Sequence, residues 1–309
     1  MKKYILGFIF TLAAIGMFVS YTARRVKTQP QQNGDSKLQI VASLYPLYFF
    51  AQQIGGDTAE VSIITPAGAE PHDYEPTAGD VARIEKSKLL ILNGGGLEAW
   101  GSAIEQTINQ TQTRVVHAGE GLITQHVKEE AKNSIDPHVW LSPPLAQKMV
   151  DTIARGFIGV DPLHAAGYEV RAMALKMKLE ELDGEYRRGL SRCAHKDILT
   201  SHAAFGYLAS AYHFNQISIA GVSPDDEPGA AQLGDLVRFA QKNGVRYIFF
   251  ESLVSPKLSE TLAREIGAQT LVLDPLEGLS SEEEATGKDY FTKMRSNLAN
   301  LTIALQCTQ

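Results

Sequence analysis

Three histidines stand in short sequence contexts that could present imidazole nitrogens to a metal ion. His72 lies in Glu-Pro-His-Asp-Tyr-Glu-Pro, His138 lies in Asp-Pro-His-Val-Trp, and His202 directly follows the run Ile-Leu-Thr-Ser. Prolines hold the first two segments in extended conformations, which suits a preformed site. A lone histidine is usually a surface or hydrogen-bonded residue, but neutral imidazole is also the commonest metal ligand among side chains. The three contexts together indicate a transition-metal site.

Two acidic residues follow apolar runs in the same way as His202. Glu251 comes directly after Tyr-Ile-Phe-Phe, and Asp274 comes directly after Thr-Leu-Val-Leu. In open parallel sheets, ligands bind beyond the carboxyl ends of the strands. Each carboxylate could be a metal ligand, support one, or simply cap the turn after its strand. Their shared position favours a common crevice.

The elements that would position these residues alternate between short β-branched runs and longer helical patterns, which predicts parallel sheets flanked by helices. Strands are expected at residues 39–44, 59–64, 89–92 and 114–116, and again at 197–201, 216–219, 246–250 and 270–273. Helices are expected at residues 47–54, 78–86, 97–109 and 145–158. The fold class is therefore α/β, with two lobes that each contain a four-stranded parallel sheet.

One long helix is expected to join the two lobes. Asp161 and Pro162 are suited to a helix start. An apolar stripe then recurs every three or four residues: Ala172, Leu175, Leu179, Leu182, Tyr186 and Leu190. Gly184 and Gly189 could interrupt the helix. We therefore predict an amino-terminal metal-binding lobe over 38–160, a linking helix over 161–192 and a carboxy-terminal lobe over 193–309.

The start of the chain indicates export. Two lysines precede an apolar run from residue 4 to residue 19, and basic residues follow it, as in a signal peptide. Residues 1–23 are therefore expected to be a signal peptide or an N-terminal anchor, and residues 24–37 a flexible spacer. The protein would be periplasmic, or membrane-anchored and facing outside the cytoplasm. Its net charge of −6 is dispersed, without the basic patch of a nucleic-acid-binding protein.

The chain contains two cysteines, which suits an exported protein with one disulfide, although two unrelated buried thiols are the alternative. Cys193 opens the second lobe at the end opposite the crevice. Ser280 and Glu283 form a capping-box pattern for a final helix that should end at that same face. We therefore expect Cys307, which follows this helix, to pair with Cys193.

These motifs resemble those of the metal-receptor subunits of zinc and manganese ABC transporters. His72, His138 and His202 lie in segments similar to the three histidine motifs of that family, and Asp274 lies in a similar Leu-Asp-Pro-Leu segment. Residues 93–100 and 221–228 complete the likeness. The resemblance implies two four-stranded lobes joined by one long helix, with His72, His138, His202 and Asp274 as direct ligands. It also implies a monomer that delivers its ion to a membrane permease.

The remaining histidines are expected to be ordinary surface residues. His117 and His126 lie at or near the short segment 119–135, close to Glu129 and Glu130, and could attract metal loosely. Many zinc receptors of the family carry a long loop rich in histidine and acidic residues at this point, and this chain has only the short segment.

Zn²⁺ is the expected cargo, because three imidazoles and one carboxylate make a low-coordinate set that suits zinc. The alternative is Mn²⁺, for which family members place glutamate where His202 stands. A zinc hydrolase is the competing class, with three histidine ligands, an open water position and Glu251 as its base. An adhesive surface protein is a third. We favour a receptor rather than an enzyme, in which Glu251 accepts a hydrogen bond from a ligand histidine.

Overall fold

The computed structural model describes residues 37–108, 112–128, 133–226 and 228–308. The predicted signal or anchor and the predicted spacer lie outside these residues, except for Lys37. Within the described part of the chain, no helix combines the length and the apolar character needed to cross a membrane.

The first sheet has four parallel strands in the order β2-β1-β3-β4. They are β1 (Leu38–Ala42), β2 (Ala59–Ile63), β3 (Leu89–Leu92) and β4 (Arg114–His117). Its helices are α2 (Tyr45–Gly55), α3 (Ala78–Lys86), α4 (Gly101–Ile108) and α5 (Pro143–Val160). Successive strand residues face opposite sides, so Val41 and Leu90 pack with residues of α3 and α4, while Ile40 and Leu89 join a core with α2 and α5. This burial on both faces explains the continuous apolar sequence of β3.

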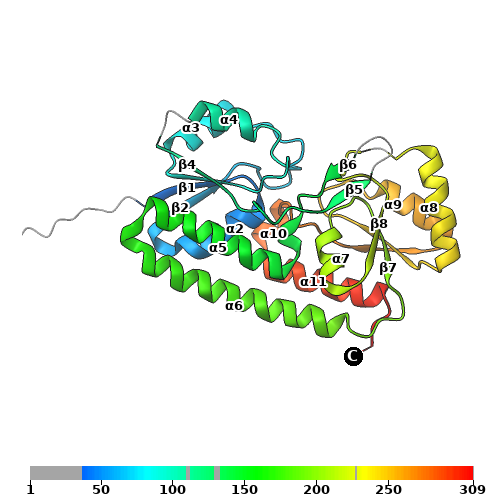
Figure 1. The fold of residues 1–309 in the computed structure, drawn as a ribbon. Helices are drawn as coiled ribbons and strands as arrows, with labels where there is room; N and C mark the ends of the chain where they lie inside the picture. The colour runs from blue at the N-terminus through cyan, green and yellow to red at the C-terminus, as the bar shows by residue number, and fades with distance from the viewer. Residues whose placement is uncertain (1–36, 109–111, 129–132, 227, 309) are drawn as a thin grey trace, which may run out of the picture. The chain divides into compact units, whose positions relative to one another are not determined.

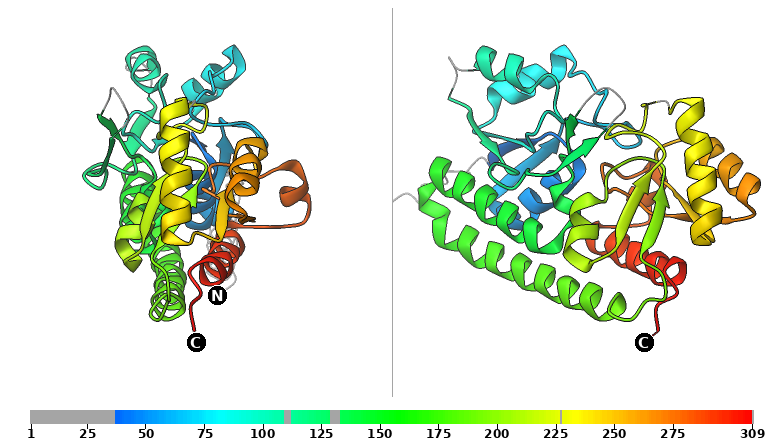
Figure 2. Two further views of the ribbon diagram at one scale, coloured as in Figure 1. Left: turned by 90° about the vertical axis from the view of Figure 1, so that its right-hand side faces the viewer. Right: turned by 45° about the vertical axis from the view of Figure 1, so that its right-hand side comes forward.

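The second sheet repeats the same plan. Its order, β10-β9-β7-β8, places the first and third strands of the lobe at the centre, as in the first sheet. The strands are β7 (Asp197–Thr200), β8 (Asn215–Ser218), β9 (Tyr247–Phe250) and β10 (Gln269–Val272). Its helices are α7 (Gly206–Tyr212), α8 (Ala230–Asn243), α9 (Lys257–Ile266), α10 (Ser281–Ala285) and α11 (Tyr290–Ala304). Figure 2 shows α8 and α9 on this sheet, and the predicted pair of four-stranded parallel sheets is confirmed.

The predicted long helix is confirmed as α6 (Ala165–Gly189), which follows a short 3₁₀ turn, η3 (Pro162–His164). It is continuous through Gly184. The predicted apolar stripe is buried, and α6 packs against α2, α5 and α11. Figure 1 shows α6 passing along helices of both lobes. The hydroxyl of Tyr186 donates a hydrogen bond of 2.7 Å to the carbonyl of Met294 and so fixes α6 to α11.

The end of the chain differs from the single final helix that we expected. The capping box of Ser280 and Glu283 forms, but it starts only the short α10. Gly287 then adopts a φ of 70°, a left-handed conformation that a helix does not continue through. A second capping box, made by Asp289 and Thr292, starts α11. Ser280 therefore starts a separate turn of helix before the final helix.

The predicted disulfide between Cys193 and Cys307 is present. Backbone hydrogen bonds flank it, from the amide of Ala194 to the carbonyl of Gln306 (3.3 Å) and from Thr308 to Arg192 (2.9 Å). Cys193 precedes β7, while His202 follows that strand. The disulfide and His202 therefore lie toward opposite ends of β7.

Candidate metal centre

Four side chains from distant parts of the chain converge on one point: His72, His138, His202 and Glu277. Their potential ligand atoms all lie within 4.8 Å of one another. Oε1 of Glu277 lies 3.1 Å from Nε2 of His72, 2.9 Å from Nε2 of His138 and 3.7 Å from Nε2 of His202. Nε2 of His138 lies 3.3 Å from that of His72 and 3.4 Å from that of His202. Each of the three imidazoles thus points its Nε2 atom at the same carboxylate oxygen of Glu277.

These separations match the edges of a small coordination tetrahedron. Zinc binds nitrogen and oxygen ligands at about 2.0–2.1 Å, so two ligand atoms at the corners of a regular tetrahedron lie about 3.3–3.4 Å apart. The five separations given above span 2.9 to 3.7 Å and centre on that value. The group therefore has the size and the chemistry of a four-coordinate zinc site.

Loops at the carboxyl ends of the two sheets supply the four side chains. His72 lies between β2 and α3, and His138 lies between β6 (Asn133–Ile135) and the 3₁₀ turn η2 (Val139–Leu141). His202 follows β7, and Glu277 lies in the turn after β10. His138 and His202 are fully buried and Glu277 nearly so, while the His72 side chain is 10% exposed. The site is thus closed from solvent except at His72.

Two carboxylates fix the orientation of two of the imidazoles. Nδ1 of His138 donates to Oδ1 of Asp136 at 2.9 Å, and Nδ1 of His202 donates to Oε1 of Glu251 at 2.6 Å. Asp136 also accepts the backbone amide of His138 at 2.9 Å, and Ser201 donates to Glu251. A proton held on Nδ1 leaves the lone pair of Nε2 free for a metal ion. The orienting contact of Asp136 was not anticipated, although its position two residues before His138 is visible in the sequence.

The carboxylates change the proton affinity of the buried imidazoles. Burial lowers the pKa of His138, but hydrogen bonds to Asp136 and Glu277 outweigh it and the pKa is raised. Burial likewise lowers the pKa of His202, but the charge and hydrogen bond of Glu251, with help from Glu277, hold it well above its usual value. Burial raises the pKa of Glu277, but hydrogen bonds from the histidines hold it well below its usual range. The site therefore favours positive charge, whether a proton or a metal ion.

We expected Asp274 to be the fourth ligand, but among the described residues the carboxylate that groups with the three histidines is that of Glu277. The Asp274 carboxylate forms an ion pair with Lys293 and accepts a hydrogen bond from the Ser252 hydroxyl. Its other oxygen accepts the amide of Leu276 at 2.7 Å. Asp274 is buried but lies outside the group of four potential ligands, because its oxygens are engaged on the side of α11.

His117 and His126, which we considered as loose metal-binding residues, lie outside the site. Nε2 of the partly exposed His117 is 3.1 Å from Glu105. His126 lies on β5 (His126–Lys128), which pairs with β6 in an antiparallel hairpin that is not among the strands we predicted. Neither residue belongs to the group of four, and Glu129 and Glu130 lie outside the described residues.

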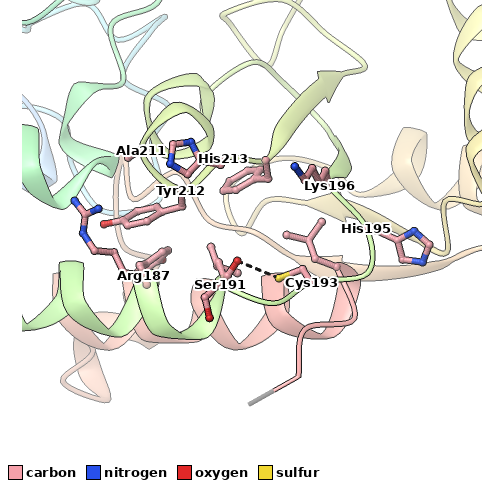
Figure 3. Close-up of a pocket in the computed structure, with 12 residues that line it drawn as sticks. Arg187, Ser191, Cys193, His195, Lys196, Ala211, Tyr212 and His213 are labelled. Carbon is pink, nitrogen blue, oxygen red and sulfur yellow. Dashed lines mark hydrogen bonds between the residues drawn. The ribbon is translucent and has the colours of Figure 1, made fainter.

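A cavity of about 350 Å³ lies elsewhere, where α6 meets the second lobe. Figure 3 shows the residues that line it. Arg187, Lys196 and Tyr212 are among the residues that line it, beside the disulfide at Cys193. Cys193 and Lys196 precede β7, at the opposite end of that strand from His202. This cavity shares no residue with the four-residue group and is separate from it.

Comparison with protein families gives a match over nearly the whole described chain. The family model described as "Zinc-uptake complex component A periplasmic" matches residues 40–304. The "High-affinity zinc uptake system protein ZnuA" of Bacillus subtilis is 38% identical, with 96% of this chain and 97% of that relative covered. The "Zinc-binding lipoprotein AdcA" of Streptococcus pneumoniae is also 38% identical, but this chain spans only 56% of its length.

Solved structures agree with the sequence comparison. The Zn(II)-bound ZnuA-like domain of Streptococcus pneumoniae AdcA superposes with a TM-score of 0.77 at 38% identity, covering 87% of this chain and 99% of that domain. A laminin-binding adhesin of Streptococcus agalactiae gives a TM-score of 0.80 at 33% identity, covering 87% and 99%. Both are similar to this chain in fold and in sequence.

Proposed function

Because this chain belongs to the family described as zinc-uptake complex component A, we propose that it is an extracytoplasmic receptor for Zn²⁺ that delivers the ion to the membrane permease of an ABC transporter. The relatives are named for zinc uptake and zinc binding, which supports the same role here. The ion is the cargo of the protein and is not consumed in a reaction.

The observation that carries this proposal is the convergence of three Nε2 atoms and one carboxylate oxygen within 4.8 Å. We propose His72, His138, His202 and Glu277 as the ligands. Four protein atoms complete a tetrahedral zinc site, which holds the ion without activating it.

Zinc is favoured over manganese by the donor set. Three nitrogens and one oxygen give a borderline-soft, four-coordinate site, whereas manganese prefers oxygen ligands and a higher coordination number. His202 supplies one of the three nitrogens and is oriented by Glu251. The test is competition between equal free concentrations of the two ions; preferential retention of manganese would overturn the choice of metal.

A zinc hydrolase is not favoured. A catalytic zinc keeps an open position for water and needs a free carboxylate as a base. Here Glu277 supplies a fourth ligand atom, and the Glu251 carboxylate accepts hydrogen bonds from Nδ1 of His202 and from the Ser201 hydroxyl. We therefore assign Glu251 to orienting His202.

Zinc titration of the metal-free protein in competition with a chromophoric chelator tests the binding role. We expect one zinc per chain, with affinity severely reduced in His138→Ala and His202→Ala. His117→Ala and His126→Ala are matched controls, because these histidines lie outside the group, and they should bind like the parent. Equal loss in the controls, or binding unchanged in His202→Ala, would refute the proposed site.

The transport role needs a cellular test. Deleting the gene from its host should slow growth in zinc-chelated medium, and a plasmid copy should restore it. A copy that carries His202→Ala should fail to restore growth while being exported at a normal level. Full rescue by that variant would separate this chain from zinc uptake.

A further inference from the structure

The backbone just before Glu277 adopts an unusual conformation. Leu276 has a φ of 56°, in the left-handed region that residues with a Cβ rarely enter. Leu276 is fully buried, and it directly precedes the carboxylate that joins the histidines. A conformation of this kind persists only where surrounding contacts hold it. The direction of Glu277 therefore depends on whatever holds this turn.

Two buried side chains hold the turn from behind. The Asp274 carboxylate accepts the amide of Leu276 at 2.7 Å, which closes the turn locally. Asn297 of α11 accepts the amide of Asp274 at 2.9 Å and donates to its carbonyl at 2.7 Å. Asn297 thus satisfies both backbone groups of the residue that closes the turn.

Lys293 also supports the turn, through an ion pair with Asp274. It lies four residues before Asn297 on α11, so both side chains project from the same face of that helix. Its ammonium pairs with the carboxylates of Asp274 and Glu283, and its side chain is only 6% exposed. A buried ammonium is tolerated only where it is paired, so Lys293 and Asp274 depend on each other.

We propose that Asp274, Lys293 and Asn297 form a positioning device that aims Glu277 at the metal. None of the three belongs to the group of potential ligands, so each would act through the turn at Leu276. This inference rests on the proposed function, because it takes Glu277 as a ligand. It also explains why Asp274, an acidic residue in a ligand-like position, faces α11.

A double-mutant cycle on zinc affinity tests the proposal. Asn297→Leu keeps the side-chain size and removes both hydrogen bonds to Asp274, so zinc binding should weaken by about 10- to 100-fold, as for the loss of other groups that orient ligands. In the Glu277→Ala background the same change should weaken binding by no more than about twofold, because the carboxylate that Asn297 helps to aim is already absent, whereas independent sites would show the same loss in both backgrounds. An equal loss in both backgrounds, or no loss in the parent, would overturn the proposal.

Lys293 gives a second test with a matched control. Lys293→Met should weaken zinc binding, and Lys293→Arg should restore much of it by keeping the cation. Lys288→Met removes a lysine that also approaches Glu283, at 3.6 Å, but is largely exposed, and it should bind zinc like the parent. If Asn297→Leu does not fold, this series decides the question. Equal losses in Lys288→Met and Lys293→Met would overturn the proposal.

Cobalt(II) bound in place of zinc provides a signature that stability alone does not change. The visible absorption of the Asn297→Leu and Lys293→Met complexes should shift toward that of Glu277→Ala, since all three lose the same ligand. A parent-like spectrum in folded Asn297→Leu would overturn the positioning role. If the parent itself bound no metal, or Glu277→Ala bound normally, the proposed function would fail instead.

Discussion

The hydroxyl of Tyr207 joins the two lobes beside the metal centre, and Tyr207→Phe removes that single atom. Tyr207 lies on α7 and is buried. Its oxygen accepts the backbone amides of Thr124 at 2.7 Å and Gln125 at 2.9 Å, and it donates to the carbonyl of Asp136 at 3.2 Å. Three hydrogen bonds between the segment that leads to His138 and the second lobe therefore depend on this hydroxyl.

The expected loss in the free energy of unfolding follows from the hydrogen-bonding groups that Tyr207→Phe leaves unpaired. Two amides lose their acceptor, and a buried donor without a partner costs about 1–3 kcal/mol. Both amides are partly buried, so we expect a total near the low end, about 2–4 kcal/mol for the pair. Because Asp136 orients His138, loosening its backbone should also weaken zinc binding by about tenfold.

Urea unfolding of the metal-free protein and zinc competition measure the two effects separately. Tyr212→Phe is the control, because it lies on the same helix and donates to Asp183 of α6 at 2.9 Å, away from the metal segments. Tyr212→Phe should lower the free energy of unfolding but leave zinc affinity unchanged. If Tyr207→Phe cost less than about 1 kcal/mol, or if both variants bound zinc equally, the role of this hydroxyl would be refuted.

Three further changes have definite expected outcomes. Replacing Cys193 and Cys307 together by serine should lower the free energy of unfolding by about 2–5 kcal/mol. Zinc affinity should stay the same, because the disulfide lies at the end of β7 opposite His202. Equal melting temperatures of the parent and the variant would contradict the first expectation. Burial raises the pKa of Asp80, but bonds from Thr77 and Arg83 lower it to about 2, so its stabilisation is complete above the unfolded value near 3.9 and is lost as pH falls toward 2. Asp80→Asn should therefore unfold about 2 kcal/mol more easily at pH 7, with the difference vanishing near pH 2 in urea titrations. Finally, the pKa values of His138 and His202 are raised, so protons compete with zinc at a higher pH than they would for free imidazole. Competition with a chelator should therefore show zinc affinity beginning to fall above pH 6.5. A zinc affinity that stayed constant down to pH 6.5 would contradict this.

The fold was predictable because its signals are local and repeated. Strands at the centre of the sheets, such as β3 and β9, read as short apolar runs, and α6 shows its buried face as a stripe that ends near Leu190. The hairpin of β5 and β6 was not predictable in this way. Its strands have three residues each and include His126, Lys128 and Asn133, so they give neither alternation nor an apolar run.

The site was predictable where chemistry coincides with the end of a strand. Glu251 directly follows β9 and His202 lies two residues after β7, so the rule for parallel sheets finds them. The choice between Asp274 and Glu277 is different, because both belong to one turn after β10. Which of the two carboxylates faces the histidines depends on the backbone conformation of that turn and on Lys293, which lies on α11. Such a long-range ion pair cannot be read from spacing along the chain.

Anomalous diffraction at the zinc edge from crystals of the zinc-loaded protein tests the central claim most directly. We predict one strong peak per chain, bonded to Nε2 of His72, His138 and His202 and to a carboxylate oxygen of Glu277, at about 2.0–2.2 Å. A peak elsewhere in the chain, or one that has Asp274 or only water in place of Glu277, would contradict the account.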